Sequence, residues 1–212
     1  MKWTIFFDLD ETLIDTSERH YTVYTDILDL YGIQNTLSKE EFWNQKRIGR
    51  KTVELLPKTS SKEFVQKFMD EWLKRIEDIR YLKYDSLLQE SLHILSILED
   101  KANLMLVTLR NNKENLFWEL DNFGLNKYFK KILVGSPLKL KNKAPLIKNY
   151  IEKHFKNNFI IIGDTEADIS AGKELGIVSI AVTYGLRTKK FLTKLKPNFY
   201  LDTLSKLPEI LK

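Results

Sequence analysis

Two acidic residues stand close together at the end of the first apolar run of the chain. Asp8 and Asp10 directly follow Trp3–Phe7, which is predicted to be a buried strand. Two like charges in such a place are costly without a cation, because burial disfavours the ionised carboxylate and the charges repel. The pattern therefore indicates a nucleophile and metal site, and the alternative is a polar loop that happens to begin with acids.

A second acidic pair favours the metal site. The apolar run Phe159–Ile162 leads into Asp164 and Asp168, so a strand again ends in carboxylates. If the two strands are neighbours in a parallel sheet, Asp8, Asp10 and Asp164 converge on one point. Carboxylate oxygens of this kind suit Mg²⁺. Asp168, one helical turn beyond Asp164, would bind the metal through water or orient Asp164.

Two further residues could bind a phosphate group near these acids. Thr108 follows the apolar run Leu104–Val107, where its hydroxyl and the next backbone N–H groups could reach phosphate oxygens. Lys143 precedes a predicted helix that contains Pro145 and could neutralise the nucleophile and the phosphoryl group, with Lys141 as the alternative. Taken alone, both signals are weak, because threonine is common in strands and a lysine in a lysine-rich stretch is usually a surface residue.

The elements that must position these residues alternate along the chain. Short apolar runs bounded by polar or turn residues predict five buried strands, and helical patterns separate the last four. This alternation predicts an α/β fold, a Rossmann-like parallel sheet with helices on both faces. The predicted strands are Trp3–Phe7, Leu104–Val107, Ile132–Val134, Phe159–Ile162 and Val178–Val182.

The stretch from about Thr16 to Asp100 shows helical patterns and no convincing strand. Aromatic and apolar residues at steps of four predict an amphipathic helix, and Ser38, Ser60 and Ser86 begin segments with the spacing of a capping box. The stripe consists of Phe64, Phe68, Trp72 and Ile76. We expect a core of residues 1–15 and 86–212 and a helical domain of residues 16–85. An insertion after the first strand enters at the ligand-binding edge of the sheet, so it could act as a lid.

Composition limits the class of protein. The 212 residues are 43% hydrophobic with a net charge of +5, and the absence of cysteine excludes disulfides, thiolate zinc sites and a cysteine nucleophile. The lysines are scattered rather than clustered, so we expect anionic small molecules as ligands and not nucleic acid. No apolar run reaches the length of a signal or membrane segment, and the expected location is the cytoplasm.

Taken in order, these motifs resemble those of the haloacid dehalogenase-like (HAD) hydrolase superfamily. Residues 8–12 match its DxDxT motif, Thr108 its second motif, Lys143 its third and residues 163–168 its GDxxxD motif. The helical insertion is similar to a type 1 cap, as in the phosphoglycolate phosphatase and β-phosphoglucomutase branch. Dehalogenases of the superfamily lack the second acid, so Asp10 favours phosphate chemistry.

The resemblance implies roles for these residues. Asp8 would attack phosphorus, and Asp10 would protonate the leaving oxygen and then deprotonate water. Thr108 and Lys143 would hold the phosphoryl oxygens. Mg²⁺ would be bound by the site formed by Asp8, the backbone carbonyl of Asp10, Asp164 and Asp168.

The resemblance also places a substrate-reading loop in the insertion. Arg50, with Arg47 and Lys51, could bind a second anionic group, and the alternative is that these are ordinary surface cations. The candidate substrate-binding residues of this chain are Thr12, Arg50, Arg110 and Asn111.

The expected function is hydrolysis of a small phosphorylated metabolite by a monomer or homodimer that does not bind a membrane. A phosphomutase with the same nucleophile is the alternative enzyme. A non-catalytic protein that binds an anion or a partner is the alternative from another class.

Overall fold

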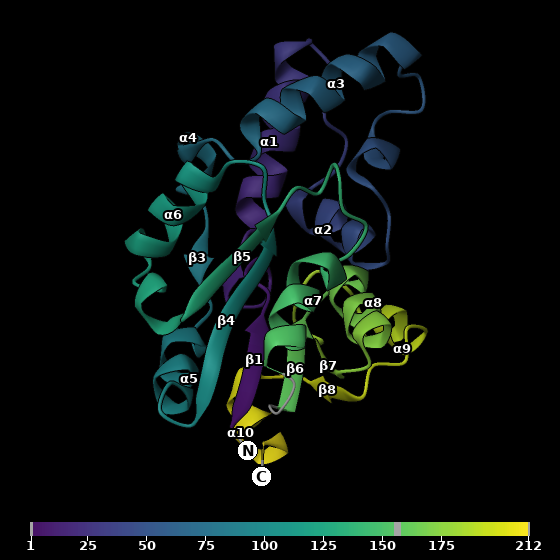
Figure 1. Cartoon of the computed structure of the whole chain (residues 1–212). Helices are drawn as coiled ribbons and strands as arrows, with labels where there is room; N and C mark the ends of the chain where they lie inside the picture. Colours follow the sequence, from purple (N-terminus) through teal and green to yellow (C-terminus); the bar gives the residue numbers. More distant parts are fainter. Residues whose placement is uncertain (1, 155–157, 212) are drawn as a thin grey trace. The chain divides into compact units, whose positions relative to one another are not determined.

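The computed structural model describes residues 2–154 and 158–211 (Figure 1). The chain divides into two compact units. One consists of Met1–Asp15 together with Leu87–Lys212, and the other is the continuous segment Thr16–Ser86. We call them the sheet unit and the helical unit.

The sheet unit is built on six parallel strands. They lie in the order β5-β4-β1-β6-β7-β8, so the first strand of the chain is in the interior of the sheet. Their bounds are β1 (Trp3–Phe7), β4 (Ala102–Leu109), β5 (Lys131–Gly135), β6 (Asn158–Gly163), β7 (Val178–Val182) and β8 (Phe199–Leu201). The predicted parallel α/β fold is confirmed. Strand β8 was not predicted, because it is a three-residue edge strand with only one fully buried side chain.

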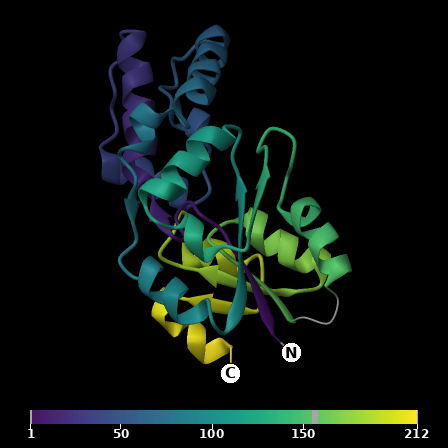
Figure 2. The ribbon, with the colours of Figure 1, turned by 60° about the vertical axis from the view of Figure 1, so that its left-hand side comes forward.

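Helices cover both faces of this sheet. Successive side chains of a strand point to opposite faces, so each apolar strand contributes to a core on either side. In β1, Ile5 and Phe7 belong to one core cluster and Phe6 to the other. Helices α5 (Ser91–Leu98), α6 (Lys113–Asn122) and α10 (Leu207–Ile210) contribute to the first cluster, together with the 3₁₀ turn η3 (Leu204–Lys206). Helices α7 (Ala144–Lys153) and α8 (Glu166–Leu175) contribute to the second. Figure 2 shows the sheet and the helices on its two faces from another side.

The remaining elements of the sheet unit are short. The 3₁₀ turn η2 (Asn126–Tyr128) precedes β5, and helix α9 (Lys189–Thr193) follows β7. The indole N–H of Trp3 donates to the carbonyl of Leu211 (3.1 Å). This bond ties the start of β1 to the end of the described chain.

The helical unit has a core of its own. Its elements are α1 (Ser17–Leu30), α2 (Lys39–Arg47), the 3₁₀ turn η1 (Thr52–Leu55), α3 (Lys62–Arg75) and α4 (Ile79–Leu82). The predicted aromatic stripe lies on α3, where Phe64 and Phe68 are buried and Trp72 and Ile76 pack against the same cluster. The helical insertion after the first strand is thus confirmed.

The predictions of helix starts were partly wrong. The capping box at Ser38 is present. Helix α3 is capped by Ser61 instead of Ser60, since the hydroxyl of Ser61 accepts the N–H of Phe64 (3.1 Å). Ser86 caps no helix. It belongs to strand β3 (Ser86–Leu87), which pairs with β2 (Ile14–Asp15), so the stretch after the first strand is not wholly helical.

Across residues 2–154 and 158–211, no helix combines the length and the apolar character needed to cross a membrane.

Candidate active site

Three strand ends meet at one edge of the sheet. Phe7 is level with Leu106 of β4 and with Ile162 of β6, and the N–H of Asp8 donates to the carbonyl of Ile162 (2.9 Å). Because β1 lies between β4 and β6, Asp8 leaves the sheet between Thr108 and Asp164. The neighbouring strands on which the predicted convergence depended are therefore present.

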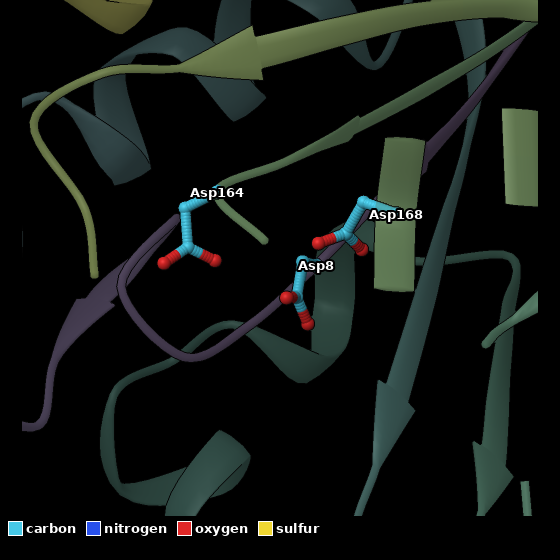
Figure 3. A group of neighbouring side chains, drawn as sticks. All are labelled: Asp8, Asp164 and Asp168. Atoms are coloured by element: carbon cyan, nitrogen blue, oxygen red, sulfur yellow. The ribbon is translucent and has the colours of Figure 1, made fainter. Parts of the chain in front are cut away.

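The convergence produces a cluster of three buried carboxyl groups. Asp8 follows β1, Asp164 follows β6, and Asp168 lies in the first turn of α8. Each offers an oxygen within 4.8 Å of the others, and Figure 3 shows the three side chains as neighbours. Such a hard-oxygen donor set is suited to a divalent cation such as Mg²⁺.

The ammonium group of Lys143 bridges two members of this cluster. Its Nζ lies 2.5 Å from Oδ1 of Asp8 and 2.6 Å from Oδ1 of Asp168, and the side chain is almost fully buried. Burial opposes the charged form of Lys143, but the carboxylates of Asp168 and Asp8 outweigh it and raise its pKa. Of the two candidate lysines, it is Lys143 that contacts Asp8, while Lys141 is exposed.

The two remaining acids of the cluster have different partners. Oδ2 of Asp164 accepts the N–H of Leu186 (2.7 Å), but its buried Oδ1 has no hydrogen-bond partner among the described residues. In Asp168, Oδ1 accepts Lys143 and Oδ2 accepts the N–H and hydroxyl of Thr165 (3.1 and 2.8 Å). Asp164 thus retains an oxygen for a cation, whereas Asp168 is occupied in orienting its neighbours.

The environment of Asp8 disfavours a charge unless a cation is near. Burial raises the pKa of Asp8 from 3.8 to about 7, and repulsion by Asp168 adds to this, while Lys143 acts in the opposite direction. Burial, followed by repulsion from Asp8 and Asp168, likewise raises the pKa of Asp164. Oδ1 of Asp8 also accepts the N–H of Leu9 (2.7 Å), so Oδ2 is the oxygen left for a ligand or for attack.

Two glycines pack directly against the side chains of Asp168 and Asp164. A Cβ at Gly163 would lie 2.1 Å from Cγ of Asp168, and a Cβ at Gly185 would lie 2.5 Å from Cβ of Asp164. Both distances are far below contact, so no other residue fits without displacing the acids. The glycine of the GDxxxD motif therefore has a steric reason in this fold.

Asp10 stands apart from the carboxylate cluster. Both of its oxygens accept N–H groups of Arg110: Nε donates to Oδ2 (3.0 Å) and Nη2 to Oδ1 (2.6 Å). Arg110, expected to face the substrate, also donates to Oε2 of Glu119 (3.0 Å). Glu119 was not predicted as a site residue, because an acid in a helix carries no sequence signal of burial.

The other candidate residues lie in different surroundings. Thr12 is fully buried, and its hydroxyl has no hydrogen-bond partner in the described part of the chain. Asn111 is exposed and accepts the hydroxyl of Ser136 (2.6 Å). Arg50 belongs to the helical unit, where it donates to the carbonyl of Glu54 (2.5 Å). Direct substrate contact by these residues stays a prediction.

Comparison with known proteins bears on this site. A family model described as haloacid dehalogenase-like hydrolase matches residues 5–182. A phosphoglycolate phosphatase of Colwellia psychrerythraea is 26% identical over 222 residues, covering 97% of this chain and 95% of its own. A pyrophosphatase, PpaX, of Listeria innocua is 24% identical over 216 residues, covering 99% and 96%.

A solved structure is similar over the same length. It is a haloacid dehalogenase-like family hydrolase, SP0104, from Streptococcus pneumoniae, with a TM-score of 0.82 and 21% sequence identity. The match covers 99% of this chain and 98% of the other, so the two proteins share a fold over both units.

Proposed function

The chain belongs to the haloacid dehalogenase-like hydrolases, and from this premise we propose that it is a Mg²⁺-dependent phosphatase that forms an aspartyl-phosphate on Asp8. The substrate would be a small phosphorylated metabolite. The observation that carries the proposal is the ammonium group of Lys143 held 2.5 Å from the carboxylate of Asp8 in a buried acidic cluster. A carboxylate that attacks a phosphate dianion must overcome charge repulsion, and an adjacent cation offsets it.

Asp8 would be the nucleophile. Its Oδ1 is held by Lys143 and by the N–H of Leu9, which leaves Oδ2 to attack phosphorus. The bond between phosphorus and the leaving oxygen breaks, and that oxygen takes a proton from Asp10. Water then attacks the phosphorus of the aspartyl-phosphate and gives its proton to Asp10. Cleavage of the acyl-phosphate at phosphorus releases inorganic phosphate and restores Asp8.

The residues of the cluster fit a magnesium ion. The carboxyl group of Asp8 and the unpartnered Oδ1 of Asp164 would hold it, with the backbone carbonyl of Asp10 as a further ligand. When bound, the ion would supply positive charge to the phosphoryl group. Asp168 would act through its contacts, because it holds Lys143 and Thr165 in place. Thr108, at the end of β4 beside Asp8, would bind a phosphoryl oxygen.

The first test is turnover of p-nitrophenyl phosphate with Mg²⁺ and with EDTA, beside an Asp8→Asn variant. We expect phosphate release that needs Mg²⁺ and disappears in the variant. A panel of 2-phosphoglycolate, sugar phosphates, nucleotides and pyrophosphate would then define the substrate. Phosphoryl transfer to a sugar phosphate instead of water would identify a phosphomutase.

A binding assay separates an inactive protein from a wrong substrate. Beryllofluoride with Mg²⁺ mimics the phosphorylated carboxylate and should raise the melting temperature of the wild type but not of Asp8→Asn. If neither the panel nor beryllofluoride gives a response, the proposed function is wrong, and a non-catalytic binding role takes its place.

A further inference from the structure

The guanidinium group of Arg110 lies between two carboxylates that come from different elements. It forms a fork with Asp10, with bonds of 3.0 and 2.6 Å, and its Nη2 also donates to Glu119 (3.0 Å). Arg110 is 4% exposed. A two-bond fork of this kind fixes both the plane and the direction of a carboxylate, which a single bond does not.

Arg110 is held in place through both its backbone and its side chain. It directly follows β4, and its backbone N–H donates to the carbonyl of Gly135 in β5 (2.8 Å). Glu119 projects from α6, which begins three residues after Arg110, and its side chain has no exposed surface. The backbone of Arg110 is thus held by strand β5, and its guanidinium group is held by Glu119 of helix α6.

Among the described residues, Arg110 is the hydrogen-bond partner of the Glu119 carboxylate. A buried carboxylate is costly unless it is paired. Oε2 of Glu119 accepts an N–H of Arg110, while its Oε1 has no hydrogen-bond partner among the described residues. The side chain of Asp10, by contrast, is 29% exposed. The Arg110–Glu119 pair is therefore the fixed part of the arrangement, and Asp10 is the part that can move.

We propose that Arg110, fixed by the buried carboxylate of Glu119, is a positioning residue that sets the orientation of Asp10 for proton transfer. The proposal rests on the proposed function, in which Asp10 exchanges protons with the leaving group and with water. An Asp10 oxygen that accepts an N–H cannot carry a proton on the same lone pair. Each Asp10 oxygen keeps a second lone pair outside the fork, and that lone pair can take and give the proton while the fork holds the plane of the carboxyl group.

This role differs from the direct substrate contact that the sequence suggested for Arg110. A residue that binds substrate changes KM when it is removed, whereas a residue that orients Asp10 changes kcat. The effect of orientation must also depend on the leaving group. An alkyl phosphate needs a proton on its departing oxygen, and p-nitrophenolate departs with little help.

The test uses Arg110→Gln, Arg110→Lys and Glu119→Gln in the full-length protein with saturating Mg²⁺. Glu114→Gln, an exposed acid on the same helix, is the matched control for Glu119→Gln. For an alkyl phosphate that the wild type hydrolyses, we expect Arg110→Gln to lower kcat by about 30-fold or more, within the range of general acid catalysis, with KM changed less than about threefold. Glu119→Gln should show the same pattern more weakly, and Glu114→Gln should show no change.

Rapid-mixing experiments with p-nitrophenyl phosphate supply a second readout. The burst of p-nitrophenolate reports formation of the aspartyl-phosphate, and its rate should stay near that of the wild type in Arg110→Gln. The later steady-state rate should fall, because water attack still needs Asp10. Arg110→Lys keeps the charge but not the fork, so it should resemble Arg110→Gln if orientation is the role.

Three outcomes would overturn the proposal. An increase in KM at unchanged kcat would make Arg110 a substrate ligand. Equal losses with both esters, burst included, would show general damage to the site, and full activity of all variants would show that the fork is dispensable. Failure of the proposed function is recognised separately, because the wild type would then give no turnover and no response to beryllofluoride.

Discussion

The carboxyl group of Asp168 occupies the space in which a side chain at residue 163 would begin. A Cβ added to Gly163 would lie 2.1 Å from Cγ of Asp168 and 2.4 Å from its Oδ2. Since Asp168 holds Lys143, and Lys143 holds Asp8, this single close approach is linked to the proposed nucleophile by two ion-pair contacts.

Replacing Gly163 with Ala should therefore impair catalysis and not only stability. We expect Asp168 to be displaced, with a loss of kcat of at least about tenfold, since small shifts of catalytic groups are costly. Gly176→Ala is the control. Gly176 has a positive φ of 65° but no atom within 4 Å of an added Cβ, so it should lose about 1 kcal/mol of stability and keep its activity. Normal activity of Gly163→Ala would show that Asp168 is free to move.

Lys143 should be needed for activity in a way that Lys141 is not. Lys143→Met removes the cation between Asp8 and Asp168, and we expect kcat to fall by more than about 10²-fold. Lys141→Met, two residues away and exposed, should retain near wild-type activity. Steady-state kinetics with Mg²⁺ would measure both. Circular dichroism would check the fold, and Lys143→Arg, which keeps the charge, should retain more activity than Lys143→Met.

The raised pKa of Asp8 predicts a pH dependence of stability without metal. Between pH 3.8 and about 7 the folded protein holds a proton on Asp8 that the unfolded chain has lost, so the contribution of Asp8 to folding stability falls as pH rises. In EDTA, the stability of Asp8→Asn relative to the wild type should thus increase as pH rises across this range. Urea unfolding of both proteins at pH 5, 6, 7 and 8 would measure the difference.

Magnesium should reverse this trend, because it binds the ionised carboxylate. We expect Mg²⁺ to raise the melting temperature of the wild type more at pH 8 than at pH 5, and to have little effect on Asp8→Asn. A magnesium effect that is the same in both proteins would place the ion away from Asp8.

The helical unit contains a buried ion pair that should govern its stability. Nε of Arg19 lies 3.1 Å from Oδ1 of Asp85, with both side chains almost without exposed surface. Asp85→Ala leaves a buried guanidinium without this partner, so we expect a loss of about 3–5 kcal/mol. Arg80→Ala breaks the exposed pair with Asp78 and should cost less than about 1 kcal/mol. Equal losses of unfolding free energy in Asp85→Ala and Arg80→Ala, measured by urea unfolding, would show that the buried pair contributes no more to stability than the exposed one.

The sequence predicted the strands and acids that depend on local patterns. Trp3–Phe7 and Val178–Val182 were predicted with the bounds they have, because both are short and mostly apolar and each is followed by a polar residue. The approach of Asp8 to Asp164 followed from one assumption, that β1 and β6 are neighbours, which the sheet order confirms. The fold class and the approach of Asp8 to Asp164 could thus be predicted, whereas Asp10, also expected at this point, is bonded to Arg110 and the third acid of the cluster is Asp168.

The rest depends on contacts between residues far apart in the chain. Glu119 looks like an ordinary solvent-facing helix acid until α6 is packed beside the end of β4, where it meets Arg110. Likewise, Ser86 has the spacing of a helix cap, but pairing with β2 places it in a strand. No local pattern distinguishes these alternatives, because the energy that decides between them comes from tertiary contacts.

The place of β1 in the sheet has a consequence for how the protein is made. Its two neighbours, β4 and β6, begin at residues 102 and 158, so the ribosome must synthesise most of the chain before β1 can pair on both edges. The helical unit is one continuous segment and can fold first. During that time the backbone N–H and C=O groups of β1, the strand before Asp8, remain unpaired. The strand next to the proposed nucleophile is thus synthesised long before its second neighbour, and it can pair on both edges only once β6 has been made.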